Sequence, residues 1–296
     1  MKRSHLVTFV LILGAVAAVG YWLERRASRA SSGLKVGTSM TSGTLNPSVE
    51  TLNSPGPASH SRGAASSRTG LRKAYTLTES VFPPSGDAAQ VIEKLKPLAL
   101  AGDARSAFLI FLKLHECARL PDARAQAALA DMSVRAGASR EAVNGSHERR
   151  RIECTSSSDF LADRGKWLEM AAAAGDEQAQ LLYASVPEAV LGGSAQMLKD
   201  PEKTVQYKAT ALRYLNDLAS RGSTDAMMRL AGAYEGGIIV APDPVKAYAY
   251  YLVVDRAKPG VISSYLMDSQ LAKVPPGRVG EARDLARRIY ASCCSN

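Results

Sequence analysis

The 296-residue chain has few aromatic residues, only four cysteines and four histidines, and none of the short motifs that mark common enzyme sites. It contains no Walker loop, no dinucleotide glycine fingerprint and no nucleophile elbow. Ser32 and Lys35 match the SxxK pattern of serine hydrolases, but no KTG or SDN partner follows. Glu169 and Asp217, expected on solvent-facing surfaces, lack paired acid–base spacing. The sequence therefore predicts no enzyme activity, no cofactor and no metal site.

The low aromatic content, 6%, also speaks against a β-sheet protein rich in valine and tyrosine. Alanine is abundant, and 46% of the residues are hydrophobic, which is enough for a real core. This composition favours helices that pack closely through small side chains. We expect an all-α fold.

The formal charge of +9 is concentrated in the N-terminal quarter. Residues 1–75 carry ten Lys and Arg but only two Glu, which leaves 27 basic and 26 acidic residues for the remainder. Nucleic-acid binding requires a basic face on a folded element, and here the basic residues lie in a tail. The sequence predicts no nucleic-acid partner.

One long apolar run lies near the N-terminus. Residues 6–23 form an 18-residue stretch that follows Lys2 and Arg3, which is just enough to span a hydrocarbon core. A signal peptide cut after Ala17 and an uncleaved anchor both fit this pattern, and the aromatic pair Tyr21 and Trp22 favours the anchor. We expect residues 1–23 to contact the membrane. The alternative is a protein secreted to the periplasm after cleavage.

Residues 24–75 are dominated by Ser, Gly, Thr and Pro, with hardly any large apolar side chain. Such a segment cannot offset the entropy lost on ordering, so it is predicted to be a disordered linker. A folded domain is expected over residues 76–296.

A short pattern of helix, glycine and helix recurs in this predicted domain. It surrounds Gly102, Gly175 and Gly222, and a weaker copy surrounds Gly137, so the spacings are 35, 38 and 47 residues. Glycine suits the left-handed residue that ends one helix, and the Asp or Ser that follows caps the next. Repeats of this length indicate stacked helical hairpins.

A second shared feature is an Asp-Pro pair after each hairpin, at residues 200–201 and 243–244. The aspartates are predicted N-caps, and the prolines suit the first helical turn because an amide is not needed there. Each pair is expected to begin the next helix pair.

These residues resemble the Sel-one-like repeats (SLR), relatives of the tetratricopeptide repeats. The resemblance rests on Gly222, Ala226, Leu230, Tyr234, Gly236, Gly237, Val240, Asp243, Lys246 and Ala247, with partial copies at Gly175, Ala179, Gln180, Asp200 and Lys203 and at Gly102, Ala104 and Ala107. It implies a right-handed solenoid of stacked antiparallel helix pairs. It also implies a mostly adaptor-like role, in which a continuous surface binds other proteins. A longer polar segment at 117–155 and an extended loop at 186–200 depart from the family pattern.

The four cysteines leave several chemical states open. Cys117 ends a predicted helix and Cys154 follows a polar insertion, and the sequence favours a disulfide between them because it would close a loop with little hydrophobic contact of its own. A zinc site formed with His115 and His147 is the alternative, although the ligand spacing lacks the usual tight pairs. Cys293 and its neighbour Cys294 fit free thiols, a bridge to another chain, or a vicinal pair.

The sequence thus favours a non-catalytic scaffold of the bacterial cell envelope, anchored in the inner membrane with its C-terminal domain in the periplasm, that binds other proteins or envelope components. The alternative is a periplasmic hydrolase or penicillin-binding protein, as suggested for cysteine-rich SLR relatives, but those carry a cysteine pair in each repeat and this chain does not. A cytosolic anchored adaptor is expected only if the cysteines are reduced.

Overall fold

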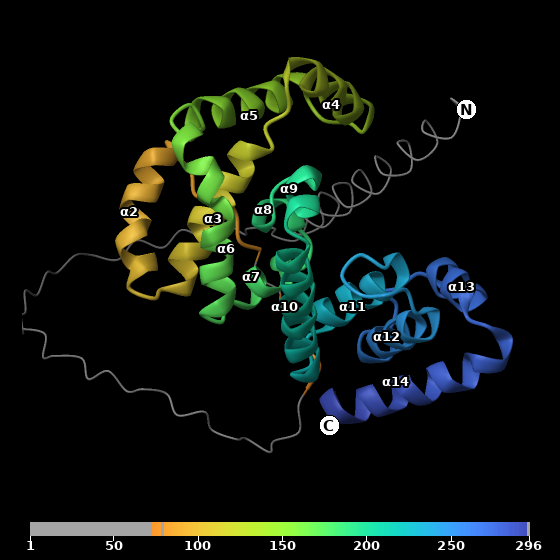
Figure 1. The fold of residues 1–296 in the computed structure, drawn as a ribbon. Coiled ribbons are helices and arrows are strands. Elements are labelled where there is room, and N and C mark those ends of the chain that lie inside the picture. The colour runs from red at the N-terminus through yellow and green to blue at the C-terminus, as the bar shows by residue number, and fades with distance from the viewer. Residues whose placement is uncertain (1–72, 78–79, 295–296) are drawn as a thin grey trace, which may run out of the picture. The chain divides into compact units, whose positions relative to one another are not determined.

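A computed structural model describes residues 73–77 and 80–294, and this part of the chain is all-helical (Figure 1). The prediction of an all-α fold is confirmed. No β-strand forms in these ranges, where a single backbone bridge pairs Tyr75 with Ser223. The helices are α2 (Ala88–Leu100), α3 (Ala104–Ala118), α4 (Ala123–Arg135), α5 (Arg140–Glu153), η1 (Ser158–Asp163), α6 (Arg164–Ala173), α7 (Glu177–Tyr183), α8 (Pro187–Val190), α9 (Ser194–Lys199), α10 (Pro201–Ser220), α11 (Thr224–Gly236), α12 (Pro244–Ala257), α13 (Ser264–Lys273), η2 (Pro276–Arg278) and α14 (Val279–Cys293).

The expected membrane segment, residues 6–23, and most of the expected linker, residues 24–72, lie outside the described residues. Within the described ranges, no helix has both the length and the apolar character needed to cross a membrane.

The hairpin turns are built from local interactions between neighbouring residues. Gly102, Gly137, Gly175 and Gly222 have closely similar positive φ angles of 97°, 97°, 96° and 98°. The residue that caps the next helix accepts a hydrogen bond from the backbone N–H three positions later, as between Asp103 and Ser106, at 2.9 Å. Helices α3, α5, α7 and α11 all begin with a cap of this kind, as the sequence pattern predicts.

The two Asp-Pro pairs also have the local geometry predicted for them. Asp200 caps α10 through the Lys203 amide at 3.0 Å, and Asp243 caps α12 through the Val245 and Lys246 amides, both at 3.1 Å. In both helices the proline occupies the first turn. The starts of these two long helices are therefore set by short-range interactions.

Each helix packs mainly on helices that are close to it in the sequence. α3 lies against α2 and α6, α6 against α7, α10 against α7 and α11, and α12 against α11, α13 and α14. The largest buried apolar side chains come from these contacts and are Ile110, Phe111, Leu114, Leu168, Leu215, Leu218, Met227, Leu230, Val245, Val253 and Val254. Between them lie fully buried alanines, which let the helix backbones approach closely. The described part is repeat-like, with hairpin added to hairpin.

Helices α4 and α5 differ from this pattern. They pack against each other and contact the other helices only sparsely (Figure 1). No residue of α5 is buried, and α4 buries only Gln126 and Ala130. This hairpin corresponds to the polar segment that departs from the repeat pattern in the sequence.

A short segment before α2 is bound to the start of α11. The Tyr75 N–H donates to Gly222 O at 3.0 Å, and its carbonyl accepts from the Thr224 N–H at 2.9 Å. The Leu77 N–H donates to Asp225 at 2.8 Å, and the Tyr75 hydroxyl donates to Glu177 at 3.0 Å. Tyr75, which the sequence analysis assigned to the linker, thus contacts the domain. Local sequence did not indicate this because all of these partners lie more than a hundred residues away.

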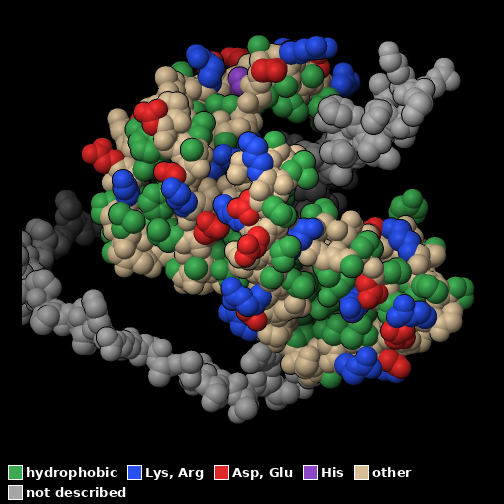
Figure 2. All heavy atoms as spheres, viewed as in Figure 1, with side chains coloured by type: hydrophobic (Ala, Val, Ile, Leu, Met, Phe, Trp, Pro, Cys, Tyr) green, Lys and Arg blue, Asp and Glu red, His purple; other side chains and the backbone are tan. Residues whose placement is uncertain are grey.

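Charges of both signs are interspersed on the face drawn in Figure 2. Many of the acidic and basic groups form pairs within one helix turn, such as Arg278 with Glu281 at 2.8 Å. This arrangement agrees with the near-neutral composition of the chain after residue 75.

Candidate functional site

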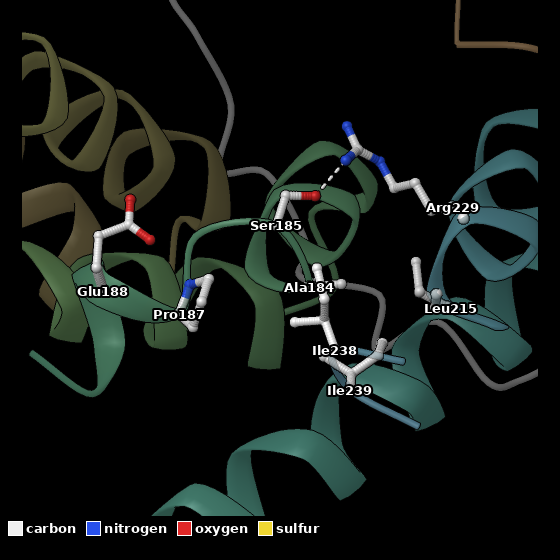
Figure 3. Close-up of a pocket in the computed structure, with 10 residues that line it drawn as sticks. Ala184, Ser185, Pro187, Glu188, Leu215, Arg229, Ile238 and Ile239 are labelled. Atoms are coloured by element: carbon white, nitrogen blue, oxygen red, sulfur yellow. Dashed lines mark hydrogen bonds between the residues drawn. The ribbon is translucent and has the colours of Figure 1, made fainter. Parts of the chain in front are cut away.

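A concave pocket of about 450 Å³ lies where the end of α7, helix α8 and the loop after α11 meet (Figure 3). Its floor and walls are mostly apolar, with Leu215 from α10 and Ile238 and Ile239 from the loop after α11. Two polar side chains, Ser185 and Arg229, meet across it. The other lining residues are Ala184, Pro187, Glu188, Gly232 and Ala233. We call this the first pocket.

The Arg229 guanidinium, on α11, is the main charged group of the first pocket. Its Nη1 donates a hydrogen bond to the Ser185 hydroxyl. The residue is exposed, yet the protein packed around its guanidinium lowers the pKa of Arg229 by burial, and the nearby Asp225 opposes this shift. The group stays cationic despite this shift, because an arginine side chain is not deprotonated in proteins.

A second pocket of about 500 Å³ adjoins the first along α11, and Gly232 lines both. Glu235 and Lys273 are its charged lining residues. Glu235 accepts hydrogen bonds from Gln270 at 2.9 Å, Lys273 at 2.5 Å and Tyr251 at 3.0 Å. Burial raises the pKa of Glu235, but these three donors outweigh burial, so its pKa lies below the ordinary value. The second pocket therefore contains a carboxylate whose bonding capacity is largely used within the domain.

Part of the repeat signature surrounds the second pocket. Tyr234, Gly236 and Ala247 line it. Lys246 pairs with the cap Asp243 at 3.3 Å and lies 5.1 Å above the Tyr234 ring. These signature residues thus shape one end of a concave surface.

The remaining signature residues have structural positions. Ala179, Ala226 and Leu230 are fully buried between helices. Gly237 ends α11 in the left-handed conformation, with φ of 69°, where a side chain would meet the Pro242 ring at 2.6 Å. None of these residues lines either pocket.

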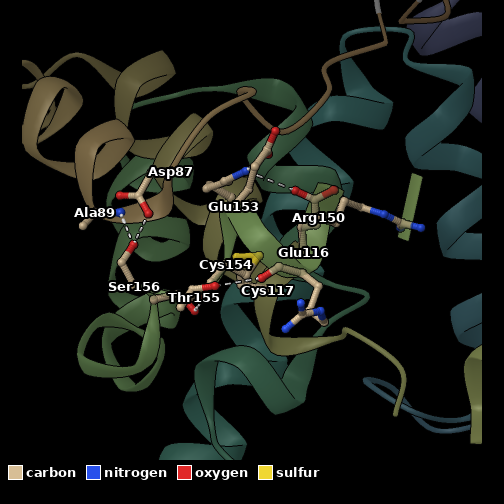
Figure 4. Close-up of a disulfide and its surroundings, with 12 residues drawn as sticks. Asp87, Ala89, Glu116, Cys117, Arg150, Glu153, Cys154, Thr155 and Ser156 are labelled. Carbon is tan, nitrogen blue, oxygen red and sulfur yellow. Dashed lines mark hydrogen bonds and ion pairs between the residues drawn. A yellow bond between two sulfur atoms is a disulfide. The ribbon is translucent and has the colours of Figure 1, made fainter. Parts of the chain in front are cut away.

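The ends of α3 and α5 are joined by a disulfide between Cys117 and Cys154, with Cα atoms 5.3 Å apart (Figure 4). Next to it, the fully buried Lys113 ammonium donates to Glu153 at 2.5 Å and lies 3.6 Å from Glu116. This hydrogen bond from Lys113 is the main cause of a lowered pKa at Glu153. A covalent bond and a buried ion pair therefore act together at the base of the α4–α5 hairpin.

The segment after α5 also holds the start of α2 (Figure 4). The Ser156 hydroxyl donates to Asp87 at 2.5 Å and accepts from the Ala89 N–H at 3.1 Å. Asp87 is the N-cap of α2, and the bond from Ser156 is the main cause of its lowered pKa. The disulfide junction thus connects α2, α3 and α5.

The histidines named for a zinc site are used differently in this geometry. His115 stacks on Phe111 with ring centroids 5.0 Å apart, and burial lowers the pKa of its imidazole. His147 Nε2 lies 3.4 Å from the Pro121 carbonyl. No group of three His, Cys, Asp or Glu side chains in the described ranges is arranged to hold a metal ion.

Cys293 and Cys294 are bonded to each other at the end of α14, and both are buried. The Cys293 carbonyl lies beside Gly222, as does the carbonyl of Lys73. The C-terminal cysteines, the repeat glycine Gly222 and the segment before α2 thus meet at one place.

Sequence reasoning missed the first pocket because its residues come from four separate segments. The only local signal was Ile238 and Ile239, two large apolar residues in a loop after a double glycine. Ile238 is 64% exposed. Glu169, expected on a solvent face, is instead half-buried, and burial raises its pKa.

The chemistry of the first pocket favours binding. Its one hydroxyl, Ser185, bonds to a guanidinium, which cannot act as a general base. No histidine or lysine is among the residues that line this pocket.

No protein-family model matches this chain, and no curated protein matches its sequence.

Proposed function

We propose that this chain is a non-catalytic adaptor of the bacterial cell envelope, built as a right-handed solenoid of stacked antiparallel helix pairs of the SLR type. The observation that carries the proposal is the pair of adjoining concave pockets that share Gly232 on α11. Repeat-like helix stacks bind partners through surfaces assembled from several hairpins, and these pockets combine residues from successive hairpins.

The proposed arrangement uses residues 6–23 as an inner-membrane anchor and residues 24–75 as a tether, with the helical domain in the periplasm. Support comes from the Cys117–Cys154 bond, because a structural disulfide persists only in an oxidising compartment. The partners are other proteins or envelope components. The linker would let the domain reach them at a distance from the membrane.

An in-cell crosslinking experiment tests the adaptor function. The photo-reactive residue p-benzoylphenylalanine is placed at Ile238, on the rim of the first pocket, or at Tyr265, which is 82% exposed on α13 and lines neither pocket. Discrete crosslinked proteins from Ile238 and none of the same proteins from Tyr265 are expected.

A blocking variant sharpens this test. A Cβ atom at Gly232 meets no atom within 4 Å, so this position has room for a side chain, and Gly232→Phe is designed to place a ring in the shared groove. This change should remove the crosslinks from Ile238 while the melting temperature stays near that of the wild type. Crosslinks that persist in Gly232→Phe, or that are absent throughout, would count against an adaptor acting through α11. Covalent labelling by a fluorescent penicillin would instead support the hydrolase alternative.

A further inference from the structure

The Arg229 guanidinium has donors that the described part of the chain does not use. Ser185 accepts one hydrogen bond, and no carboxylate in the described ranges pairs with this arginine. Asp225, one helical turn before it, instead accepts from the Leu77 backbone. The nearest acidic group on the same helix is therefore engaged with the segment before α2.

The chemistry of these unused donors is specific. A guanidinium presents five N–H groups in a planar fork that matches the two oxygens of a carboxylate. Ser185 holds the side chain across the pocket and so reduces the rotamer freedom that binding would otherwise remove. Arg229 is thus oriented before a ligand arrives.

The surface beside the guanidinium is apolar. Ile238, Ile239 and Leu215 line the pocket, and Arg229 and Glu188 lie toward its opposite ends (Figure 3). Glu188 lies at the other end, where its carboxylate points away from Ser185 and Arg229 and lies 3.9 Å from Arg119. A ligand carboxylate at Arg229 would therefore not meet Glu188 directly.

The second pocket provides the contrast. Its two charged residues, Glu235 and Lys273, are paired with each other, and Glu235 accepts three hydrogen bonds in all, whereas Arg229 has no carboxylate partner in the described ranges. The first pocket therefore contains a cation that no described carboxylate pairs with, while the cation and the anion of the second pocket pair with each other.

We propose that the first pocket binds a partner segment that carries a carboxylate next to a branched apolar side chain, with the carboxylate on Arg229 and the side chain against Ile238 and Ile239. This inference deepens the proposed adaptor function and rests on it. The carboxylate comes either from an acidic side chain or from a chain end, and the probes below separate these sources.

The test uses the full chain in lipid nanodiscs with ¹³C-labelled isoleucine methyl groups, so that Ile238 and Ile239 report on the pocket. Three probes are titrated: N-acetyl-leucine, which has a terminal carboxylate, N-acetyl-leucyl-glutamic acid α-amide, whose only carboxylate is that of the glutamate side chain, and N-acetyl-leucinamide, which has none. Saturable shifts of both methyl signals, with dissociation constants on the order of 1 mM for such small probes, are expected from at least one carboxylate probe. The neutral amide should bind at least tenfold more weakly.

Variants assign the effect to the guanidinium. Arg229→Gln should lower carboxylate affinity at least tenfold, and Arg229→Lys should recover only part of it because the fork is lost. Lys208→Gln, which removes an exposed charge on α10 away from both pockets, should change nothing. Circular dichroism melts of each variant show whether it is folded.

The outcomes separate the two proposals. Equal binding of the amide and the carboxylates, or full binding by folded Arg229→Gln, would overturn the carboxylate assignment. The absence of binding by any probe would also overturn the carboxylate assignment. If the Ile238 crosslinks in cells persist in Arg229→Gln, the carboxylate assignment fails while the adaptor function stands. If no crosslinks form at all, the adaptor function fails.

Discussion

The α10–α12 region and the α4–α5 hairpin use the same turn geometry but are held in place by different forces. In α11, Ala226, Met227, Leu230 and Ala231 are fully buried. In α5 no residue is buried, and the hairpin is attached at its base by the Cys117–Cys154 bond and the ion pair of Lys113. Burial of apolar surface holds the first region, and a covalent and ionic clamp holds the second.

The difference shows that a repeat-like hairpin does not need its own apolar core if it is closed at the base. A disulfide restricts the unfolded chain, so a hairpin that contains one loses less conformational entropy on folding than the same hairpin without it. This gain does not depend on how much surface the hairpin buries. The α10–α12 region contains no cysteine and depends on burial of side chains and close approach of helices. The following predictions test this contrast, beginning with the largest effect.

Removal of the disulfide should affect α4 and α5 most. The double variant Cys117→Ser, Cys154→Ser opens a loop whose ends are 37 residues apart, and its free energy of unfolding should fall by roughly 3 to 4 kcal/mol. Denaturant titration measures the loss, and hydrogen exchange should show faster exchange in α4 and α5 than in α11 and α12. Each single variant should behave like the double.

The same bond tests the location of the domain. Mass spectrometry of non-reduced peptides from cells should recover Cys117 and Cys154 linked. If both thiols are alkylated in freshly quenched cells, the periplasmic placement is wrong and the cytosolic alternative is favoured.

Two helical glycines should respond in opposite directions to alanine. A Cβ at Gly165, in α6, would lie 2.2 Å from the Ala189 carbonyl oxygen, whereas a Cβ at Gly145, in α5, meets nothing within 4 Å. Gly165→Ala should lower the free energy of unfolding by about 3 kcal/mol through overpacking. Gly145→Ala should raise it by about 0.5 to 1 kcal/mol through helix propensity. Equal effects of the two changes, measured by denaturation, would show that α5 and α6 are equally crowded at these two positions.

The buried ion pair predicts a pH dependence of the hairpin attachment. Glu153→Gln should lower the free energy of unfolding at pH 7 by about 2 kcal/mol, because the buried Lys113 loses its closest anionic partner. The folded pKa of Glu153 lies below its ordinary value of 4.5, so its contribution is present above that pH and is lost as the pH falls through the folded pKa.

The difference between wild type and Glu153→Gln should therefore close in acid. Glu281→Gln is the control, since Glu281 forms an exposed pair with Arg278 and its removal should cost little. A gap that stays constant from pH 7 to acid, measured by denaturation at each pH, would show that Glu153 does not act through its charge.

Alanine substitutions at the repeat glycines Gly102 and Gly222 should separate the cost of backbone strain from the cost of crowding. Both have positive φ, near 97°, but a Cβ at Gly222 would lie 3.1 Å from Lys73 O and 3.2 Å from Cys293 O, while one at Gly102 meets nothing. Alanine at Gly102 should cost roughly 1 kcal/mol from backbone strain alone. Alanine at Gly222 should cost about 1 kcal/mol more, and identical melting temperatures for the two variants would exclude the added crowding.

Sequence reasoning identified the all-α class, the turn glycines, the helix caps at Asp200 and Asp243, and the polar character of the 117–155 segment. These features depend on interactions within three or four residues, such as a cap side chain with a nearby amide, so the local sequence contains the information. The pairing of Cys117 with Cys154 was the favoured one of several states that the four cysteines allowed.

The tertiary structure alone decided which side chains meet from distant segments. Arg229 faces Ser185 across 44 residues, and Tyr75 binds the start of α11 across nearly 150 residues. Lys113 is buried against Glu153 across 40 residues, although nothing near it distinguishes it from an exposed lysine. Helical periodicity says which face of a helix is apolar, but the partner of a polar group follows from how the helices stack. The first pocket belongs to this second kind of information, because four separate segments form it.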